Sequence, residues 1–171
     1  MAKMRKALVL VSLLALSIPA LGSIATAPAI AGEDDKFHAR LTSYQEVPTL
    51  STTGRGQFRA TLTSPTTLSF ELKYELLEGG NPTAAHIHLG QRATNGGIIA
   101  DLCGGLKPVC PAQPATVTGT IVPADVVGPA AQGIAPGEFA ELIKAMRAEV
   151  TYANVHNATY PGGEIRGQID D

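Results

Sequence analysis

The sequence predicts an all-β domain, an antiparallel Greek-key sandwich or small barrel that carries one short amphipathic helix. Apolar and polar residues alternate through most of the chain after residue 36, which is typical of strands with one buried and one wet face. Gly, Pro and Asn are frequent between these stretches, where strands have to turn. Helical spacing is clear in a single segment, so we expect one helix packed on a sheet.

The predicted strands follow one another at short intervals. In "FHARLTSYQEV" (37–47), every second residue from Phe37 to Leu41 is apolar. The stretches "GQFRATLTS" (56–64) and "TLSFELKYELLE" (67–78) alternate in the same way, and "SPTT" between them predicts a hairpin turn. Further short strands are predicted at 84–90, 96–102, 115–122, 149–156 and 163–170.

The helix is predicted in "PGEFAELIKAMRAE" (136–149), where Phe139, Leu142 and Met146 recur at helical spacing. A Pro-Gly pair precedes this apolar stripe, and acidic residues stand near its start, where the helix dipole favours them. The stretch before it, "PADVVGPAAQGIAPGE" (123–138), predicts an irregular crossover.

The first 31 residues have the layout of a secretory signal peptide. A basic start, "MAKMRK", precedes the apolar run "ALVLVSLLAL", and small residues in an A-x-A arrangement occur at Ala27–Ala29 and Ala29–Ala31. A membrane anchor is the weaker alternative, because Ser17, Pro19 and Gly22 interrupt the apolar run. We expect a leader at residues 1–31 and a single exported domain at 32–171, secreted or periplasmic.

Charge and hydropathy exclude some classes of partner. Removal of the leader would take away three of the 13 basic residues and none of the 15 acidic ones, leaving a net charge of −5. A mildly acidic domain without a basic run is a poor candidate for nucleic acid. No long apolar stretch follows the leader, so we expect no membrane span in the mature protein.

Two cysteines, Cys103 and Cys110, bracket the Gly/Pro-containing loop "GGLKPV". An isolated close pair in an oxidising compartment favours a disulfide. A metal site with two thiolates is the alternative, although it normally needs a second pair or nearby histidines.

The histidines give the strongest chemical signal. His86 and His88 in "HIHLG" share one face of a predicted strand, and His156 ends another. If these strands are neighbours, three imidazoles converge as ligands for copper or zinc, with His38 as a candidate fourth ligand. The alternative is that the histidines only form hydrogen bonds that brace the sheet.

A second group of polar residues surrounds the turn "PGG" at 161–163. We interpret Glu46, Asn154, Glu164 and Arg166 as a structural polar network, in which Arg166 pairs with Glu164 or Glu46 and locks the last strand to the first. The chain has no nucleotide-binding glycine loop and no G-x-S-x-G elbow, so we predict no catalytic residues.

Three motifs in this order, "LTSYQEVP", "AAHIHLGQRATNGGII" and "YANVHNATYPGGEIRGQI", resemble the CHRD domain named after chordin. The resemblance runs from about Phe37 to Ile169. The family pattern usually reads "NVHT" after an aliphatic residue, whereas this chain has Asn157 in the threonine's place and Ala153 before the motif. The resemblance implies one β domain of immunoglobulin size, secreted or periplasmic, with no well-established enzymatic activity.

The function we expect is binding of a transition metal, copper first and zinc as the alternative, for storage, delivery or sequestration. Metal binding should weaken as the imidazoles protonate near pH 6. One rival is a non-catalytic interaction module for another exported or cell-surface protein. A weaker rival is a redox enzyme of the superoxide-dismutase type, for which Arg92 and Arg55 could guide the substrate.

Overall fold

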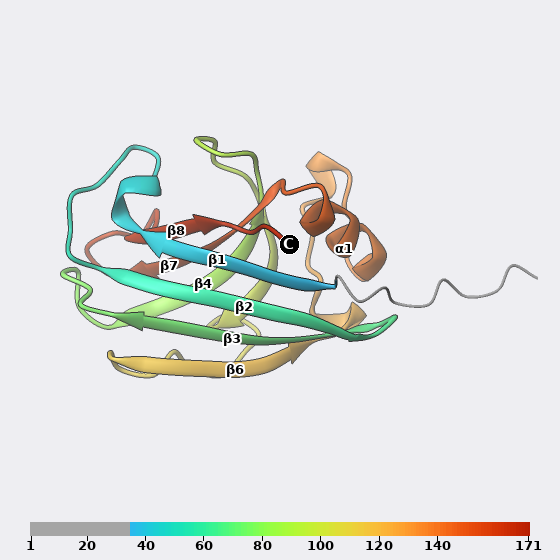
Figure 1. The fold of residues 1–171 in the computed structure, drawn as a ribbon, viewed down its shortest axis with the longest axis horizontal. Coiled ribbons are helices and arrows are strands. Elements are labelled where there is room, and N and C mark those ends of the chain that lie inside the picture. The colour runs from blue at the N-terminus through green and yellow to red at the C-terminus, as the bar shows by residue number, and fades with distance from the viewer. Residues whose placement is uncertain (1–34) are drawn as a thin grey trace, which may run out of the picture.

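The structure is a computed structural model that describes residues 35–171, so the predicted leader lies outside the described residues (Figure 1). The elements are β1 (Lys36–Thr42), β2 (Arg55–Ser64), β3 (Thr67–Glu75), β4 (Pro82–Leu89), β5 (Ile98–Cys103), β6 (Ala115–Ile121), α1 (Phe139–Arg147), β7 (Thr151–Asn157) and β8 (Ile165–Gln168), with three short 3₁₀ turns.

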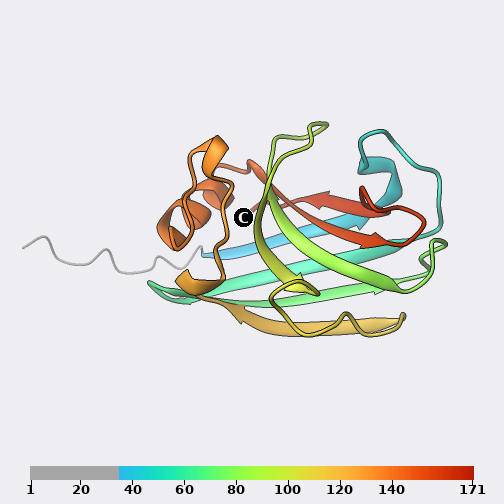
Figure 2. The ribbon, with the colours of Figure 1, turned by 180° about the vertical axis from the view of Figure 1, so that it is seen from behind.

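The eight strands form one antiparallel sheet in the order β5-β4-β7-β8-β1-β2-β3-β6. The sheet curls until it is a nearly closed barrel (Figures 1 and 2). Four pairs are consecutive in the chain, β1 with β2, β2 with β3, β4 with β5 and β7 with β8. The pairs β1 with β8, β3 with β6 and β4 with β7 join distant parts of the chain. The all-β prediction is confirmed, and of the two architectures it allowed, the structure has the barrel.

The interior of the barrel follows from the alternation in the sequence. On β3, Leu68, Leu72 and Tyr74 are at most 1% exposed, while Glu71 and Lys73 between them form an ion pair of 2.8 Å on the outer face. Inward apolar side chains from the other strands complete the core. Burial of these side chains is the main contribution to folding, at roughly 25 cal/mol per Å² of apolar surface.

The strands β7 and β8 differ because all of their residues are buried on both faces. Their outer face carries polar side chains, which two loops cover. Arg166 donates to the carbonyl of Thr94 at 2.7 Å, and Gln168 donates to that of Gly90 at 3.0 Å. The candidate site lies on this outer face, beside the loop that contains both carbonyls.

The helix α1 packs against one end of the barrel, as both ribbon views show (Figures 1 and 2). Its apolar stripe is buried as predicted, with Leu142 and Met146 at 0% exposure. The helix runs from Phe139 to Arg147 and is therefore shorter than the predicted stretch 136–149. The predicted irregular crossover before it contains two 3₁₀ turns, Pro123–Asp125 and Ala130–Gln132.

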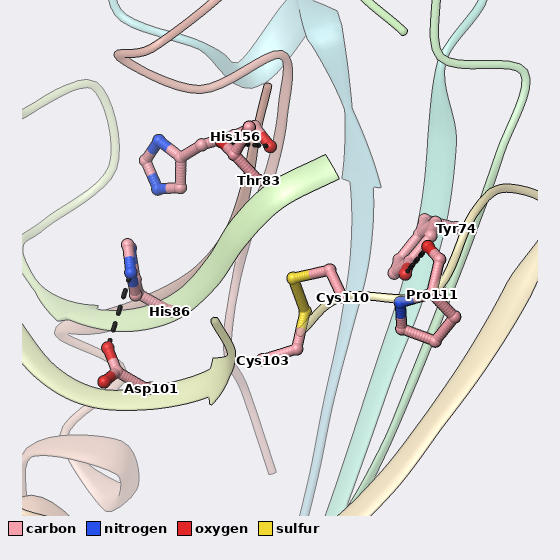
Figure 3. Close-up of a disulfide and its surroundings, with 8 residues drawn as sticks. All are labelled: Tyr74, Thr83, His86, Asp101, Cys103, Cys110, Pro111 and His156. Carbon is pink, nitrogen blue, oxygen red and sulfur yellow. Dashed lines mark hydrogen bonds and ion pairs between the residues drawn. A yellow bond between two sulfur atoms is a disulfide. The ribbon is translucent and has the colours of Figure 1, made fainter. Parts of the chain in front are cut away.

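The predicted disulfide is present between Cys103, which ends β5, and Cys110 (Figure 3). It closes residues 104–109, which we call the stapled loop. None of the helices in residues 35–171 has the length and apolar character needed to cross a membrane.

Removal of a buried leucine tests the assignment of the core. Leu72→Ala should lower the free energy of unfolding by about 3 kcal/mol, because Leu72 is 0% exposed and leaves a cavity. The matched control is Leu106→Ala in the stapled loop, where the side chain is 70% exposed and the change should stay within about 0.5 kcal/mol. Urea unfolding measures both, and equal losses would contradict the inward orientation of Leu72.

Candidate metal centre

The histidine cluster, His86, His88 and His156, forms where β4 pairs with β7. In the antiparallel register Ala84 lies opposite His156 and His86 lies opposite Asn154. The three rings therefore project from the same outer face, with Ile87 turned into the core at 0% exposure. The ring centroid of His86 lies 4.8 Å from that of His156 and 5.4 Å from that of His88. One ligand atom from each histidine lies within 4.8 Å of the others.

The cluster lines an open surface pocket of about 460 Å³. Figure 3 shows His86 and His156 projecting into the same space from adjacent strands. The other lining residues come from β4, β7, the start of β5 and nearby loops: Thr83, Ala84, Asn95, Gly96, Ile98, Tyr152, Pro161 and Gly162.

Each imidazole is held through one ring nitrogen. The Nδ1 of His88 lies 3.0 Å from the carbonyl oxygen of Gly96, and the Nδ1 of His156 lies 3.0 Å from that of Pro161. The Nε2 of His86 lies 3.4 Å from a carboxylate oxygen of Asp101. Carbonyl oxygens only accept hydrogen bonds, so the Nδ1 atoms of His88 and His156 carry the ring proton. The carboxylate beside His86 favours a proton on Nε2 of that ring.

The opposite nitrogens, His86 Nδ1, His88 Nε2 and His156 Nε2, are buried and have no hydrogen-bond partner in the described part of the chain. Buried polar atoms nearly always have a partner, so three together at one place require an explanation. In a neutral ring with its proton on the other nitrogen, each of the three presents a lone pair. A lone pair of this kind is what a metal ion binds.

A stack of side chains holds the loop that anchors His88. The ring of Tyr152 lies parallel to that of His88 at 4.8 Å, and its hydroxyl accepts the backbone N–H of Gly96 at 3.1 Å. The guanidinium of Arg166 lies 3.7 Å from the centre of the Tyr152 ring. It also donates to Asn95 Oδ1 at 3.1 Å. Arg166 therefore fixes the loop whose carbonyl orients His88.

The comparison with known families agrees with the motifs in the sequence. A family model described as "CHRD domain" matches residues 37–169, nearly all of the described chain. The chain belongs to the CHRD family. No curated protein and no solved structure matches it. The histidine cluster and both cysteines lie within the matched residues of this CHRD domain.

The polar network of this CHRD domain differs in its pairing from the prediction. Arg166 forms no ion pair with Glu164 or Glu46 within the described chain, because carbonyl and amide oxygens surround its guanidinium instead. Glu164 accepts the backbone N–H groups of Glu78 and Gly79 at 2.7 and 3.0 Å. It also accepts the side-chain amide of Asn157. Glu164 thus ties the last turn to the loop before β4, and not to β1.

Glu46 is buried beside Arg166 and Asn154. Burial raises the pKa of Glu46 to about 7, although the Arg166 charge and a hydrogen bond from Asn154 oppose the shift. The carboxyl therefore carries its proton part of the time at neutral pH.

The other basic candidates lie away from the cluster. His38 is on β1 with 63% of its side chain exposed, and its Nε2 lies 3.3 Å from Asp170. It does not belong to the group of converging ligand atoms, so the suggested fourth ligand is not supported. Arg92 pairs with Asp170 at 3.5 Å and Arg55 with Glu75 at 2.7 Å. Neither arginine lines the histidine pocket.

Sequence reasoning missed Asp101 and the two carbonyls. The sequence does contain a signal for Asp101, because an aspartate inside "IIADLC" is a charged group in an otherwise apolar strand. The carbonyls of Gly96 and Pro161 leave no trace in residue types, since every residue has one.

Burial keeps the imidazoles neutral. Burial, reinforced by the charges of the neighbouring rings, lowers the pKa of His88 to about 4 and that of His156 to about 4. Burial also lowers the pKa of His86, against the opposing effect of Asp101. The protonation expected near pH 6 is therefore displaced to lower pH, and the lone pairs are free at neutral pH.

These shifts predict acid sensitivity of the metal-free protein. An unfolded histidine has a pKa near 6.5, so between about pH 6.5 and 4 the unfolded chain binds more protons than the folded one. The free energy of unfolding should therefore fall as pH drops through this window. The loss is on the order of 3 kcal/mol for each of His88 and His156.

The measurement is urea unfolding of the metal-free wild type and of the double variant His88→Gln/His156→Gln from pH 7 to 4.5. The variant should lose less stability on acidification. Glu46 acts in the opposite direction, because its raised pKa gives stability that is lost as pH rises through about 7, but it is present in both proteins and cancels. Parallel pH profiles would contradict the burial of neutral imidazoles.

Proposed function

We propose that this CHRD domain binds one transition-metal ion, copper in preference to zinc, through His86 Nδ1, His88 Nε2 and His156 Nε2. The observation that carries the proposal is the set of three buried, unpartnered nitrogens at one place. The second nitrogen of His88 and of His156 is hydrogen-bonded to a carbonyl oxygen, and that of His86 lies 3.4 Å from a carboxylate oxygen. Oxygen acceptors of this kind fix metal-bound histidines in proteins.

The chemistry of the donors favours copper. Three neutral imidazoles without a thiolate suit copper and zinc, and the general affinity order of divalent ions places Cu²⁺ above Zn²⁺. Metal–nitrogen bonds of about 2 Å put neighbouring donors roughly 3.3 Å apart, so the rings would move slightly inward from their spacing of up to 4.8 Å. The histidines line an open surface pocket, so a further donor could reach a bound ion from solvent.

The role that follows is storage, delivery or sequestration of copper outside the cytoplasm, by a secreted or periplasmic protein. The disulfide supports an oxidising compartment. Membership in the CHRD family supports an extracellular or periplasmic domain. The open surface pocket supports exchange of the ion with another protein, because an incoming donor can bind before a histidine leaves.

A non-catalytic interaction module is the second candidate. It is favoured by exposed apolar side chains on the surface, among them Tyr44 at 67%, Leu106 at 70% and Val109 at 86%. In that case the histidines only brace the sheet, and chelators would leave the melting temperature unchanged.

A copper titration of tag-free protein tests the proposal. Wild type should take up one Cu²⁺ per chain, and His88→Ala should lose at least about 100-fold in affinity, because a ligand is removed. His38→Ala is the matched control and should bind as wild type does, since His38 lies outside the cluster. The chain has no tryptophan, so quenching of tyrosine emission reports binding, with Tyr152 stacked on His88. Equal uptake by wild type and His88→Ala would overturn the proposal.

Thermal unfolding gives an independent check. A ligand that binds only the folded state stabilises it by RT ln(1 + [L]/Kd), about 2.7 kcal/mol at 100-fold excess over Kd. Copper should therefore raise the melting temperature of wild type and His38→Ala but not of His88→Ala. Circular dichroism verifies that each variant is folded.

A further inference from the structure

The carboxylate of Asp101 joins the histidine cluster to the stapled loop. One oxygen, Oδ1, lies 3.4 Å from His86 Nε2, and the other, Oδ2, accepts the backbone N–H of Leu106 at 2.7 Å. Figure 3 shows this contact next to the disulfide, with His86 and Asp101 on adjacent strands. Asp101 is 8% exposed, so its carboxylate is buried.

We infer that Asp101 is a positioning residue that keeps the proton of His86 on Nε2 and its lone pair on Nδ1, and that the stapled loop sets the place of this carboxylate. The stapled loop then controls the affinity of the metal centre without touching the metal. Only the control of metal affinity rests on the proposed function, because the proton position of His86 is defined with or without a metal.

His86 needs this support more than the other two ligands do. His88 and His156 are oriented by backbone carbonyls and offer Nε2, whereas His86 is oriented by a charged side chain and offers Nδ1. A carboxylate that accepts the ring N–H also makes the opposite nitrogen a stronger donor. His86 is therefore expected to bind the metal most strongly, provided that Asp101 stays in place.

The strand that carries Asp101 is not held in place by regular pairing. β5 is at the end of the strand order, and its register with β4 shifts on both sides of the His86–Ile87 pair. Backbone pairing alone thus fixes the carboxylate less firmly than it would on a central strand. The stapled loop supplies the missing constraint.

The stapled loop is built around the carboxylate. Gly105 has a φ of +57°, and a Cβ atom there would lie 2.3 Å from Asp101 Oδ2, so glycine permits the contact. Gly104 N–H donates to the Pro108 carbonyl at 2.8 Å. Lys107 reaches the Thr120 carbonyl at 3.0 Å and Asp125 at 2.7 Å, which fixes the tip of the loop. The disulfide closes its base, and both cysteines are buried.

The first experiment reads the proton position of His86 in metal-free protein by ¹⁵N NMR. Wild type should show a protonated Nε2 and a bare Nδ1. In Asp101→Asn the amide oxygen can still accept Leu106 N–H, while its NH₂ group faces the ring and donates to Nε2. The proton should therefore move to Nδ1, the nitrogen needed for the metal. An unchanged Nε2 proton in Asp101→Asn would overturn the inference.

The second experiment measures Cu²⁺ affinity by competition with a chelator. Asp101→Asn should lose 10- to 100-fold, the usual effect of removing a residue that orients a ligand. Gly105→Ala should lose affinity as well, because the new methyl group displaces the carboxylate. Gly133→Ala is the matched control, since Gly133 also has a positive φ, +95°, but nothing lies within 4 Å of an added Cβ. Gly133→Ala should bind as wild type does.

Loss of affinity in Gly133→Ala equal to that in Gly105→Ala would overturn the role of the loop, because strain alone would then explain the effect. The double variant Cys103→Ala/Cys110→Ala should lose affinity and broaden the His86 signals while those of His156 stay sharp. Wild-type protein that binds no copper would overturn the proposed function, and the NMR comparison would still decide the role of Asp101.

Discussion

The antiparallel register between β4 and β7 is the constraint on which the histidine cluster depends. Side chains alternate between the two faces of a strand, so a slip by one residue would turn His156 into the apolar interior of the barrel. Val155, which is 0% exposed, would then have to face outward. Such a side chain contributes roughly 1.5–3 kcal/mol when it is fully buried. The apolar core thus holds the alignment that the polar face requires.

The outer face of β7 and β8 is an unusual place for buried polar groups, because the interior of a barrel normally provides the burial. Here the loops around Glu46 and Asn95 provide it, and Arg166 at 2% exposure lies beneath them. A buried charge is costly unless hydrogen bonds surround it. The oxygens of Thr94 and Asn95 and the ring of Tyr152 satisfy this requirement. The cluster is consequently held in place by contacts that do not involve a metal.

Sequence alone predicted what depends on local pattern. Period-two alternation identified the strands, and it placed His86 with His88 on one face. The convergence of His156 was conditional on a pairing between β4 and β7, which lie far apart in the chain, and the structure confirms that pairing. Side chains that meet only because the fold pairs distant strands could not be predicted from local alternation. Asp101 reaches His86 across the β4–β5 pair, where the register is irregular.

The error over Glu164 has a related cause. Residues two apart on a strand share a face, which suggested that Glu164 and Arg166 were neighbours. The strand begins only at Ile165, and Gly163 before it has a φ of +122°. The chain therefore turns at Glu164, and its carboxylate binds the loop at Gly79 instead. Alternation is a reliable guide inside a strand and fails at the residue that precedes it.

The link from Lys107 to the carbonyl of Thr120 has a consequence for self-association. β6 is the last strand in the sheet, and backbone groups on the free side of a terminal strand can recruit a strand from a second molecule. The Lys107 ammonium donates to the Thr120 carbonyl of this strand and is held there by its ion pair with Asp125. A second copy of the chain would have to displace it before adding a strand there, so the lysine helps to keep the barrel from polymerising through its open seam.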